Sequence, residues 1–319
     1  MPANPLPAEF ALIARHFRPL AGPGALDLAD DAALIAPPPG RELVLTVDAM
    51  VGGVHFLAAD PPDLIGRKLL RVNLSDLAAK GAIPLGYLMT VAAPRDTSDA
   101  FFAGFAQGLA ADQATFAITL LGGDTTRTPG PLTLSLTAIG HVAPGAMLRR
   151  AGARRDDGIW VTGTIGDGAL GLRVAQGKLH DATGYLLDRY RLPRPRLGIA
   201  LAGVASAAMD VSDGLVQDLG HICRASGVGA VLEAARVPLS DPARAAGPQW
   251  FETCLTGGDD YELLMAVPPA HDAALIAACA AAGVAVTQIG RFHTGRPDVT
   301  VRGPDGETLA FGSGGWSHF

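Results

Sequence analysis

Strand-length apolar runs alternate with helical patterns along the whole chain, and this alternation restricts the possible folds more than any other feature. Runs at 43–48 (LVLTVD), 132–141 and 263–267 have the length and apolar content of strands. Segments 62–79 and 215–225 repeat apolar residues at three- and four-residue spacing, as amphipathic helices do. The pattern therefore predicts a mixed α/β (α+β) protein.

The length of 319 residues exceeds that of one small domain and suits two of medium size. Further strand patterns lie at 117–121, 159–163 and 207–211, and further helical patterns at 100–113, 169–176 and 270–282. Segment 142–157 combines Pro, Gly and four arginines between two strand patterns. We therefore predict one domain at 1–144 and a second at 145–319.

Composition excludes several classes of protein. No apolar stretch reaches the ~18 residues that a membrane span needs, and the N-terminus shows no signal-peptide pattern. The formal net charge is -6 and no basic run is present, so we expect no nucleic-acid partner. The three cysteines lie far apart in the sequence, which favours a reducing cytoplasm over a disulfide framework or a zinc site.

Six aspartates are conspicuous: four lie at the end of a strand or between a strand and a helix, one lies just before an apolar run, and one lies in NLSDLAAKGA. They are Asp31, Asp48, Asp76, Asp124, Asp210 and Asp213. Such junctions are where ligands collect in sheet proteins. Any one of these residues alone is more simply a turn former, and Ser212 or Asp213 alone is more simply a helix cap.

Asp76 is harder to explain as a surface residue. It continues the apolar stripe of Ile65, Leu69 and Val72, where a carboxylate is costly unless it is paired or bound to a metal. An ion pair with Lys80, four residues on, is the structural alternative. Thr46 and Asp48 offer a second clue, because a strand directs both side chains to one face. They would suit a hard cation or, equally, a solvent-facing edge.

Six converging carboxylates would repel one another without cations, and ligands that are all oxygen select Mg²⁺ or Mn²⁺ over zinc. Because Mg²⁺ usually shares its ligand sphere with phosphate oxygens, this predicts nucleotide phosphate chemistry. The P-loop and protein-kinase motifs are absent from the sequence. The match to G-x-G-x-x-G at 166–171 is interpreted as a glycine turn that enters a helix. The amides that open the helix after Gly214 could add a phosphate site.

A set of segments in fixed order carries a family resemblance. These segments are LADDAA, LTVDAMVGGVHF, KLLRVNLSDLAAKGA, LLGGDTTR, MDVSDGLVQDLGHI, GGDDYELL and GWSHF. Together they resemble the thiamine-monophosphate kinase family, within the aminoimidazole-ribonucleotide-synthetase-like superfamily, over nearly the whole chain. NLSDLAA, GGDTT and VSDGL occur more loosely in other members of the superfamily.

The resemblance implies a two-domain architecture whose N-terminal domain pairs with that of a second subunit into a dimeric β-barrel, with the active site between the domains. It implies transfer of a phosphoryl group from ATP to thiamine phosphate with several Mg²⁺ ions, Arg150 acting with the metals. By motif match, the metal ligands would be Asp31, Thr46, Val47, Asp48, Asp76, Asp124, Asp210 and Asp213. Gly123, Asp124, Arg150 and Ser212 would contact ATP, and His55, Asp259 and Trp316 would contact thiamine phosphate.

The sequence departs from the family pattern at three positions. Val47 stands where a hydroxyl residue is usual, so only its carbonyl oxygen can reach a metal. Ala29 replaces a glycine, and Asp259 replaces a glutamate that is one methylene longer. A superfamily neighbour with another acceptor and a non-catalytic nucleotide- or metal-binding protein are the alternative functions. Without the resemblance, His55 is interpreted as a core or capping residue, Arg150 as part of a solvated connection and Trp316 as a loose end or a packing anchor.

Overall fold

The computed structural model describes residues 8–317, which form two compact units. The first unit contains the described residues up to Leu77 together with Ile83–His141. The second contains Ala78–Ala82 and the described residues from Val142 onward. The two domains predicted at 1–144 and 145–319 thus resemble these units, although the change of unit falls at 141/142 and the short segment Ala78–Ala82 was not expected to join the second.

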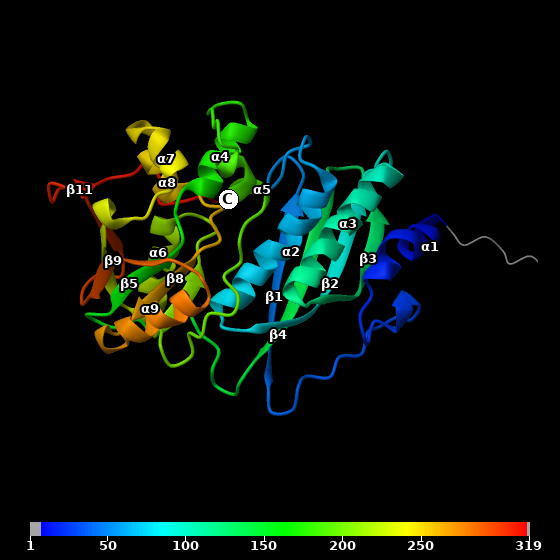
Figure 1. The fold of residues 1–319 in the computed structure, drawn as a ribbon, viewed down its shortest axis with the longest axis horizontal. Coiled ribbons are helices and arrows are strands. Elements are labelled where there is room, and N and C mark those ends of the chain that lie inside the picture. Colours follow the sequence, from blue (N-terminus) through cyan, green and yellow to red (C-terminus); the bar gives the residue numbers. More distant parts are fainter. Residues whose placement is uncertain (1–7, 318–319) are drawn as a thin grey trace, which may run out of the picture. The chain divides into compact units, whose positions relative to one another are not determined.

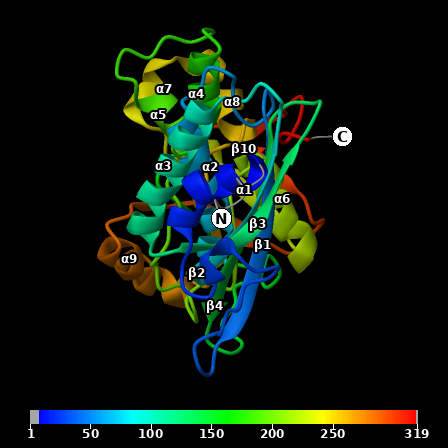
Figure 2. The ribbon, with the colours of Figure 1, turned by 90° about the vertical axis from the view of Figure 1, so that its right-hand side faces the viewer.

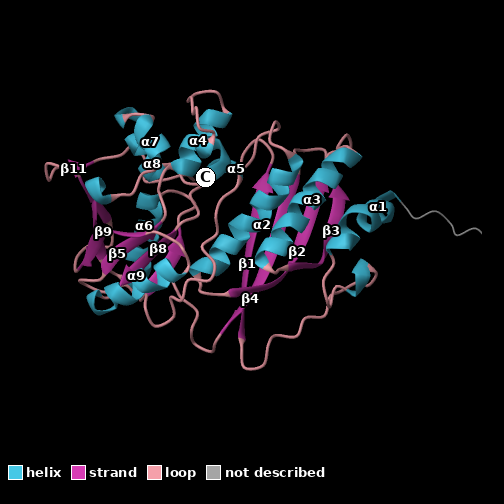
Figure 3. Cartoon of the chain, in the orientation of Figure 1, coloured by secondary structure: helices cyan, strands magenta, loops and turns pink. Residues whose placement is uncertain are grey.

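The first unit is a four-stranded sheet with helices on one side, as Figure 1 and Figure 3 show. Its strands are β1 (Glu42–Val51), β2 (Ile83–Ala93), β3 (Thr119–Arg127) and β4 (Thr133–Val142), in the spatial order β1-β4-β2-β3. Its helices are α1 (Ala8–Leu12), α2 (Pro62–Ala79) and α3 (Asp99–Phe116). Figure 2 shows α2 and α3 on the same side of the β1 and β3 strands. The sheet is open, with β1 and β3 at its two edges.

Alternation along β1 explains how this sheet is oriented. Val44 and Met50 are buried, whereas Leu43, Leu45 and Val47 on the other face are exposed. The buried face packs on the apolar stripes of α2 and α3, because a strand sends successive side chains to opposite faces. The exposed face is apolar, which is unusual for a sheet surface that faces water.

The second unit is a mixed seven-stranded sheet with the spatial order β11-β10-β7-β9-β5-β8-β6. Its strands are β5 (Gly158–Thr162), β6 (Ala207–Asp210), β7 (Gly229–Glu233), β8 (Leu263–Val267), β9 (Val286–His293), β10 (Val299–Arg302) and β11 (Thr308–Leu309). Its helices are α4 (Asp167–Ala175), α5 (Tyr185–Arg191), α6 (Leu215–Ser226), α7 (Asp241–Ala245), α8 (Phe251–Thr256) and α9 (Asp272–Ala281).

Both faces of the second sheet are covered, which explains its continuous apolar strands. Leu264 of β8 belongs to a core cluster with Leu219 of α6, and Met265 belongs to another with Leu275 of α9. All five residues of β8 are therefore buried. This strand and the helix at α9 were predicted from the sequence, and both are confirmed. The mixed two-unit α/β architecture is confirmed as well.

One further sequence expectation is tested by the fold. Gly166 immediately precedes α4, so the interpretation of 166–171 as a turn entering a helix is confirmed. The described residues contain no helix that is long and apolar enough to cross a membrane. The three cysteines are buried free thiols.

Candidate active site

Thr46, Asp48 and Asp76 come together at the β1 edge of the first unit. Thr46 Oγ1 donates a hydrogen bond of 2.5 Å to Asp76 Oδ2, which joins β1 to α2. The backbone N–H of Asp48 donates to Asn73 Oδ1 at 3.0 Å, one turn earlier on α2. Asn73 is fully buried, and its Nδ2 donates to the carbonyl of Leu69. The three predicted ligands are thus half-buried oxygen donors on one local framework.

Asn73 is a functional candidate that the sequence analysis missed. Its side chain joins β1 to α2 at the level of Asp48. This hydrogen bond explains why a fully buried amide is tolerated on an otherwise apolar helix face. Asp76 drew attention because it is a polar residue on an apolar helix face. Asn73, three residues earlier in NLSD, has the same property.

The loop after β1 holds His55 in a defined orientation. The backbone N–H of Val51 donates to His55 Nδ1 at 3.0 Å. Since Nδ1 is then an acceptor, neutral His55 carries its proton on Nε2, which can donate to a phosphate oxygen. Lys68 of α2, which is buried, donates from Nζ to the carbonyl of His55 at 3.0 Å. The geometry suits the phosphate contact predicted for His55.

Gly123 and Asp124 lie on β3, beside a cavity of about 690 Å³. A Cβ at Gly123 would stand 1.8 Å from the carbonyl oxygen of Met89, so this position requires glycine. Asp31 lines the same cavity as Asp124. The apolar part of the lining includes Phe10, Ile13, Phe17, Ile35, Leu88 and Ile139. A volume of this size with an apolar wall and a few polar groups is typical of a small-molecule pocket.

Asp124 does not lie beside Asp48 and Asp76 in the chain. It aligns with Thr90 of β2 and so lies on the exposed face of the sheet, whereas Asp48 lies on the helix-covered face. β1 and β3 are also opposite edges, three strand spacings or about 14 Å apart. One metal cluster cannot bridge that separation. The expectation that the acidic side chains of one chain converge therefore does not hold for Asp124 within this unit.

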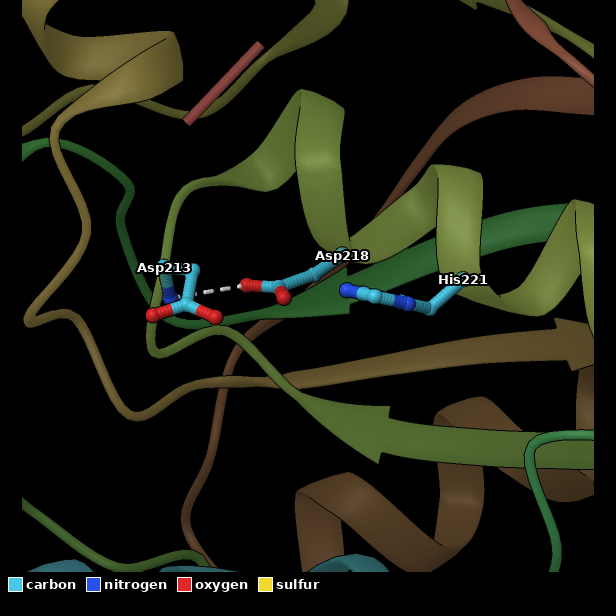
Figure 4. A group of neighbouring side chains, drawn as sticks. All are labelled: Asp213, Asp218 and His221. Atoms are coloured by element: carbon cyan, nitrogen blue, oxygen red, sulfur yellow. Dashed lines mark hydrogen bonds between the residues drawn. The ribbon is translucent and has the colours of Figure 1, made fainter. Parts of the chain in front are cut away.

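Asp210, Ser212 and Asp213 lie in the second unit, where β6 ends and α6 begins. The carboxylate of Asp218, in the first turn of α6, holds this turn in place. Its Oδ2 accepts the backbone N–H groups of Ser212, Asp213 and Gly214 at 3.0, 3.1 and 3.2 Å. Figure 4 shows the Asp218 carboxylate between Asp213 and His221. Asp218 was not among the residues predicted from the sequence, although it interrupts the apolar face between Leu215 and Leu219.

Asp218 also corrects an expectation about phosphate binding. The amides that open α6 at Gly214 were expected to be available to a phosphate, but the Gly214 N–H already donates to Asp218, as do the N–H groups of Ser212 and Asp213 just before it. A similar arrangement occupies the glycine turn at α4, where Asp260 accepts N–H groups from Gly166 and Gly168 at 2.8 and 3.1 Å. An internal carboxylate therefore stands at both helix openings, where a phosphate would otherwise bind.

Charge at this turn is concentrated around Asp218. Burial, and then the neighbouring Asp210 and Asp213, raise the pKa of Asp218 to about 8. The ligand atoms of Asp213, Asp218 and His221 lie within 4.8 Å of one another. Burial and then Arg224 and Arg150 lower the pKa of His221. These arginines and the three amides on Asp218 argue against a cation held by this trio.

The other residues predicted for the second unit lie around the same turn. The Asp259 N–H donates to the carbonyl of Ser212 at 2.9 Å, and the Trp316 N–H donates to the carbonyl of Asp213 at 2.9 Å. Trp316 leaves 54% of its surface exposed, so its ring is accessible for stacking. Arg150 is exposed, and its charge acts on His221. The structure thus brings Ser212, Asp213, Asp259 and Trp316 into one neighbourhood.

We expect Asp218→Ala to destabilise the second unit by about 2–4 kcal/mol, because three backbone N–H groups would lose their acceptor. Asp218→Asn keeps a side-chain oxygen that can accept them, and should cost less than half as much. Urea unfolding of the metal-free protein measures both changes. Equal stability of the alanine variant and the wild type would contradict the structural role of Asp218.

The comparisons with known proteins agree with this architecture. Residues 29–142 match the family described as AIR synthase related protein, N-terminal domain, and residues 154–302 match its C-terminal domain. A crystal structure of thiamine-monophosphate kinase from Stenotrophomonas maltophilia K279a has a TM-score of 0.83 and 41% identity, covering 95% of this chain and 98% of that one. The two units therefore define an AIR synthase-related protein.

Two further relatives narrow the assignment from the superfamily to one family. Thiamine-monophosphate kinase of Caulobacter vibrioides is 49% identical over 304 residues, which cover 92% of this chain and 86% of the relative. The structure of AaThiL complexed with AMPPCP and TMP has a TM-score of 0.78 and 29% identity, covering 91% of each chain. Within the AIR synthase-related proteins, the chain belongs to the thiamine-monophosphate kinase family.

Proposed function

We propose that this protein transfers the γ-phosphoryl group of ATP to thiamine phosphate and releases ADP and thiamine diphosphate. The observation that carries the proposal is the near full-length likeness to thiamine-monophosphate kinases, including a structure named for its complex with AMPPCP and TMP. The three buried thiols agree with action in a reducing cytoplasm.

The donor atoms of the candidate site suit magnesium. Thr46 and Asp76 present a hydroxyl and a carboxylate in direct contact, and Asp48 lies on the same face of β1. Such a set of oxygen donors selects a hard divalent cation. We assign the Mg²⁺ ligands to Asp31, Thr46, the Val47 carbonyl, Asp48, Asp76, Asp124, Asp210 and Asp213. Bound Mg²⁺ supplies positive charge that offsets repulsion between the two phosphate groups.

The remaining residues bind and orient the two substrates. Gly123 and Asp124 line the cavity on β3, which is large enough for a nucleoside, and we assign ATP to them with Ser212 and Arg150. His55, through Nε2–H, and the region of Asp259 and Trp316 receive thiamine phosphate. The acceptor phosphate has a second pKa near 6 and is already an anion at neutral pH. No general base is needed, so catalysis consists of alignment and charge neutralisation.

We further propose that the protein acts as a homodimer that buries the exposed face of the first sheet. Leu45, Val47 and Leu88 on this face are 62%, 60% and 39% exposed. β1 and β3 are the two edge strands of the sheet, and the β3 edge is bridged by Ala21 at Leu120. A second copy can cover the apolar face and pair with these edges, which would close two four-stranded sheets into a barrel.

Such a dimer also supplies a reason for the position of Asp124. If the β3 edge of one copy lies beside the β1 edge of its partner, Asp124 of the first copy stands next to the strand that carries Thr46 and Asp48 in the other chain. Each metal site would then combine ligands of two chains. This arrangement removes the separation of about 14 Å that keeps Asp124 from Asp48 within one chain.

We expect Leu45→Glu to convert the dimer into a monomer, because a buried, unpaired carboxylate at the interface is costly. Light scattering after size-exclusion chromatography would show half the wild-type mass. Ile276→Glu, which alters a 49% exposed residue of α9 in the second unit, is the matched control and should leave the mass unchanged. A wild type that elutes as a monomer at micromolar concentration contradicts the proposal.

The activity itself is tested by incubating the protein with ATP, Mg²⁺ and thiamine phosphate and resolving the products by chromatography. Thiamine diphosphate and ADP should form in equal amounts. Phosphorylation of a different acceptor, without thiamine diphosphate, would show that the substrate assignment is wrong. Nucleotide binding by calorimetry without ADP formation would instead favour a non-catalytic binding protein.

A further inference from the structure

The segment Gly257–Glu262, between α8 and β8, has an unusual backbone. Asp259 and Tyr261 have φ angles of 63° and 54°, in the left-handed region that side chains other than glycine rarely adopt. Gly258 between α8 and these residues packs so closely that a Cβ would lie 2.3 Å from the carbonyl oxygen of Ser212. Such a backbone persists only where its surroundings hold it in place.

Buried charged side chains hold this segment in place. Arg189 of α5 is 1% exposed, and its Nη2 donates both to the Asp260 carbonyl and to Glu262 Oε1, each at 3.0 Å. One amino group therefore contacts the backbone of the residue before Tyr261 and the side chain of the residue after it. Glu262 is fully buried and also accepts from Thr162 Oγ1 at 2.7 Å.

Arg196 lies in the proline-containing stretch after α5 and also binds Glu262. Its Nε donates to Glu262 Oε2 at 2.6 Å and its Nη2 donates to Oε1 at 2.5 Å. This is a two-bond contact that a lysine cannot reproduce.

Stability alone does not explain these charges. A buried ion pair contributes little net stability compared with apolar residues of equal volume. Among the described residues, Nε and Nη1 of Arg189 have no hydrogen-bond partner, and Nε lies only at ion-pair distance, 3.9 Å, from Asp167 Oδ2, so its burial carries a cost. These contacts instead hold the residues on either side of Tyr261 in a single geometry. The Tyr261 hydroxyl in turn donates to Asp259 Oδ1 at 3.2 Å.

We propose that Arg189, Arg196 and Glu262 are positioning residues that orient Asp259 toward thiamine phosphate. The proposal rests on the function proposed above, in which Asp259 contacts that substrate. Asp259 is one methylene shorter than the glutamate usual in the family, so its reach depends closely on the backbone that carries it. The neighbouring turn at Ser212 accepts one hydrogen bond from the Asp259 N–H, but Asp218 also holds it, so the ATP contacts should be affected less.

The test is Arg196→Lys, which keeps the positive charge and removes the two-bond contact. We expect KM for thiamine phosphate to rise about tenfold, with kcat and KM for ATP within about twofold of the wild type. The matched control is Arg194→Lys, two residues away, where the arginine is half-exposed and lies 3.5 Å from Asp188. It should leave both KM values unchanged.

A second measurement separates positioning from general destabilisation. In an Asp259→Asn background, Arg196→Lys should raise KM for thiamine phosphate much less, because the group that it orients is already altered. An additive effect, an unchanged KM in the single variant, or an equal rise in both KM values would overturn the proposal. If Arg196→Lys does not fold, Glu262→Gln makes the same comparison with nearly the same side-chain volume.

These outcomes are distinct from failure of the proposed function. A wild type that forms no thiamine diphosphate refutes that function. A wild type that forms it, together with an Arg196→Lys variant that has wild-type KM, refutes only the positioning role.

Discussion

Asp48→Asn is expected to lower kcat by about a thousandfold, because the lost carboxylate is assigned to the charge that binds Mg²⁺ between the two phosphates. The fold should survive the change. The contact of Asp48 with α2 runs through its backbone N–H and Asn73 Oδ1, and an asparagine leaves that bond in place. Asparagine also has nearly the same volume, so packing on β1 is preserved.

Steady-state kinetics and urea unfolding measure the two parts of this prediction. Asp241→Asn provides the control, since the Asp241 side chain is 98% exposed at the start of α7 and pairs only at 3.7 Å with Arg244. The control should retain wild-type kcat. Full activity in Asp48→Asn would show that the metal assignment on β1 is wrong.

Mixing two inactive variants is expected to restore activity if each site combines two chains. Asp48→Asn and Asp124→Asn chains, unfolded and refolded together in equal amounts, form mixed dimers in about half of all pairings. Each mixed dimer has one site that carries both changes and one that carries neither. The mixture should therefore show about a quarter of the wild-type activity.

A control pair makes this result specific. Asp48 and Asp76 lie in the same local framework of one chain, so chains with Asp48→Asn and Asp76→Asn should give no recovery when mixed. In their mixed dimers, both sites keep one altered ligand. Lack of recovery in the Asp48→Asn and Asp124→Asn mixture, when dimers are seen to form, would place both ligands in the site of one chain.

Prediction of the fold from sequence succeeded where local patterns were strong. The helices at α2 and α6 and the strand β8 follow continuous or periodic apolar residues, and each was expected within a residue or two of its observed bounds. Strand β2 was missed. Its sequence, IPLGYLMTVAA, has few β-branched residues and contains Pro84 and Gly86, where its register with β4 shifts. Pairing with two neighbouring strands stabilises it, and no local pattern reports such pairing.

The residues of the candidate site likewise divide into those that the sequence pointed to and those that it did not. Asp48, Asp76 and Asp213 could be selected because carboxylates beside glycines, at strand ends or on apolar stripes are chemically conspicuous. Asn73 and Asp218 were overlooked because their partners are backbone groups, which carry no signature in the sequence. The buried pair of Arg189 and Glu262, 73 residues apart in the chain, was invisible for a similar reason.

Residue order along the chain was enough to establish the strongly patterned elements, the set of acidic side chains and the family, since these depend on short-range periodicity and on motifs. Which carboxylates become neighbours depended on the strand order β1-β4-β2-β3 and on the packing of α2 against β1. That order places Asp48 and Asp124 on opposite edges and opposite faces of one sheet. It arises from hydrogen bonds between strands that are distant in sequence, and only the folded chain specifies which of them form.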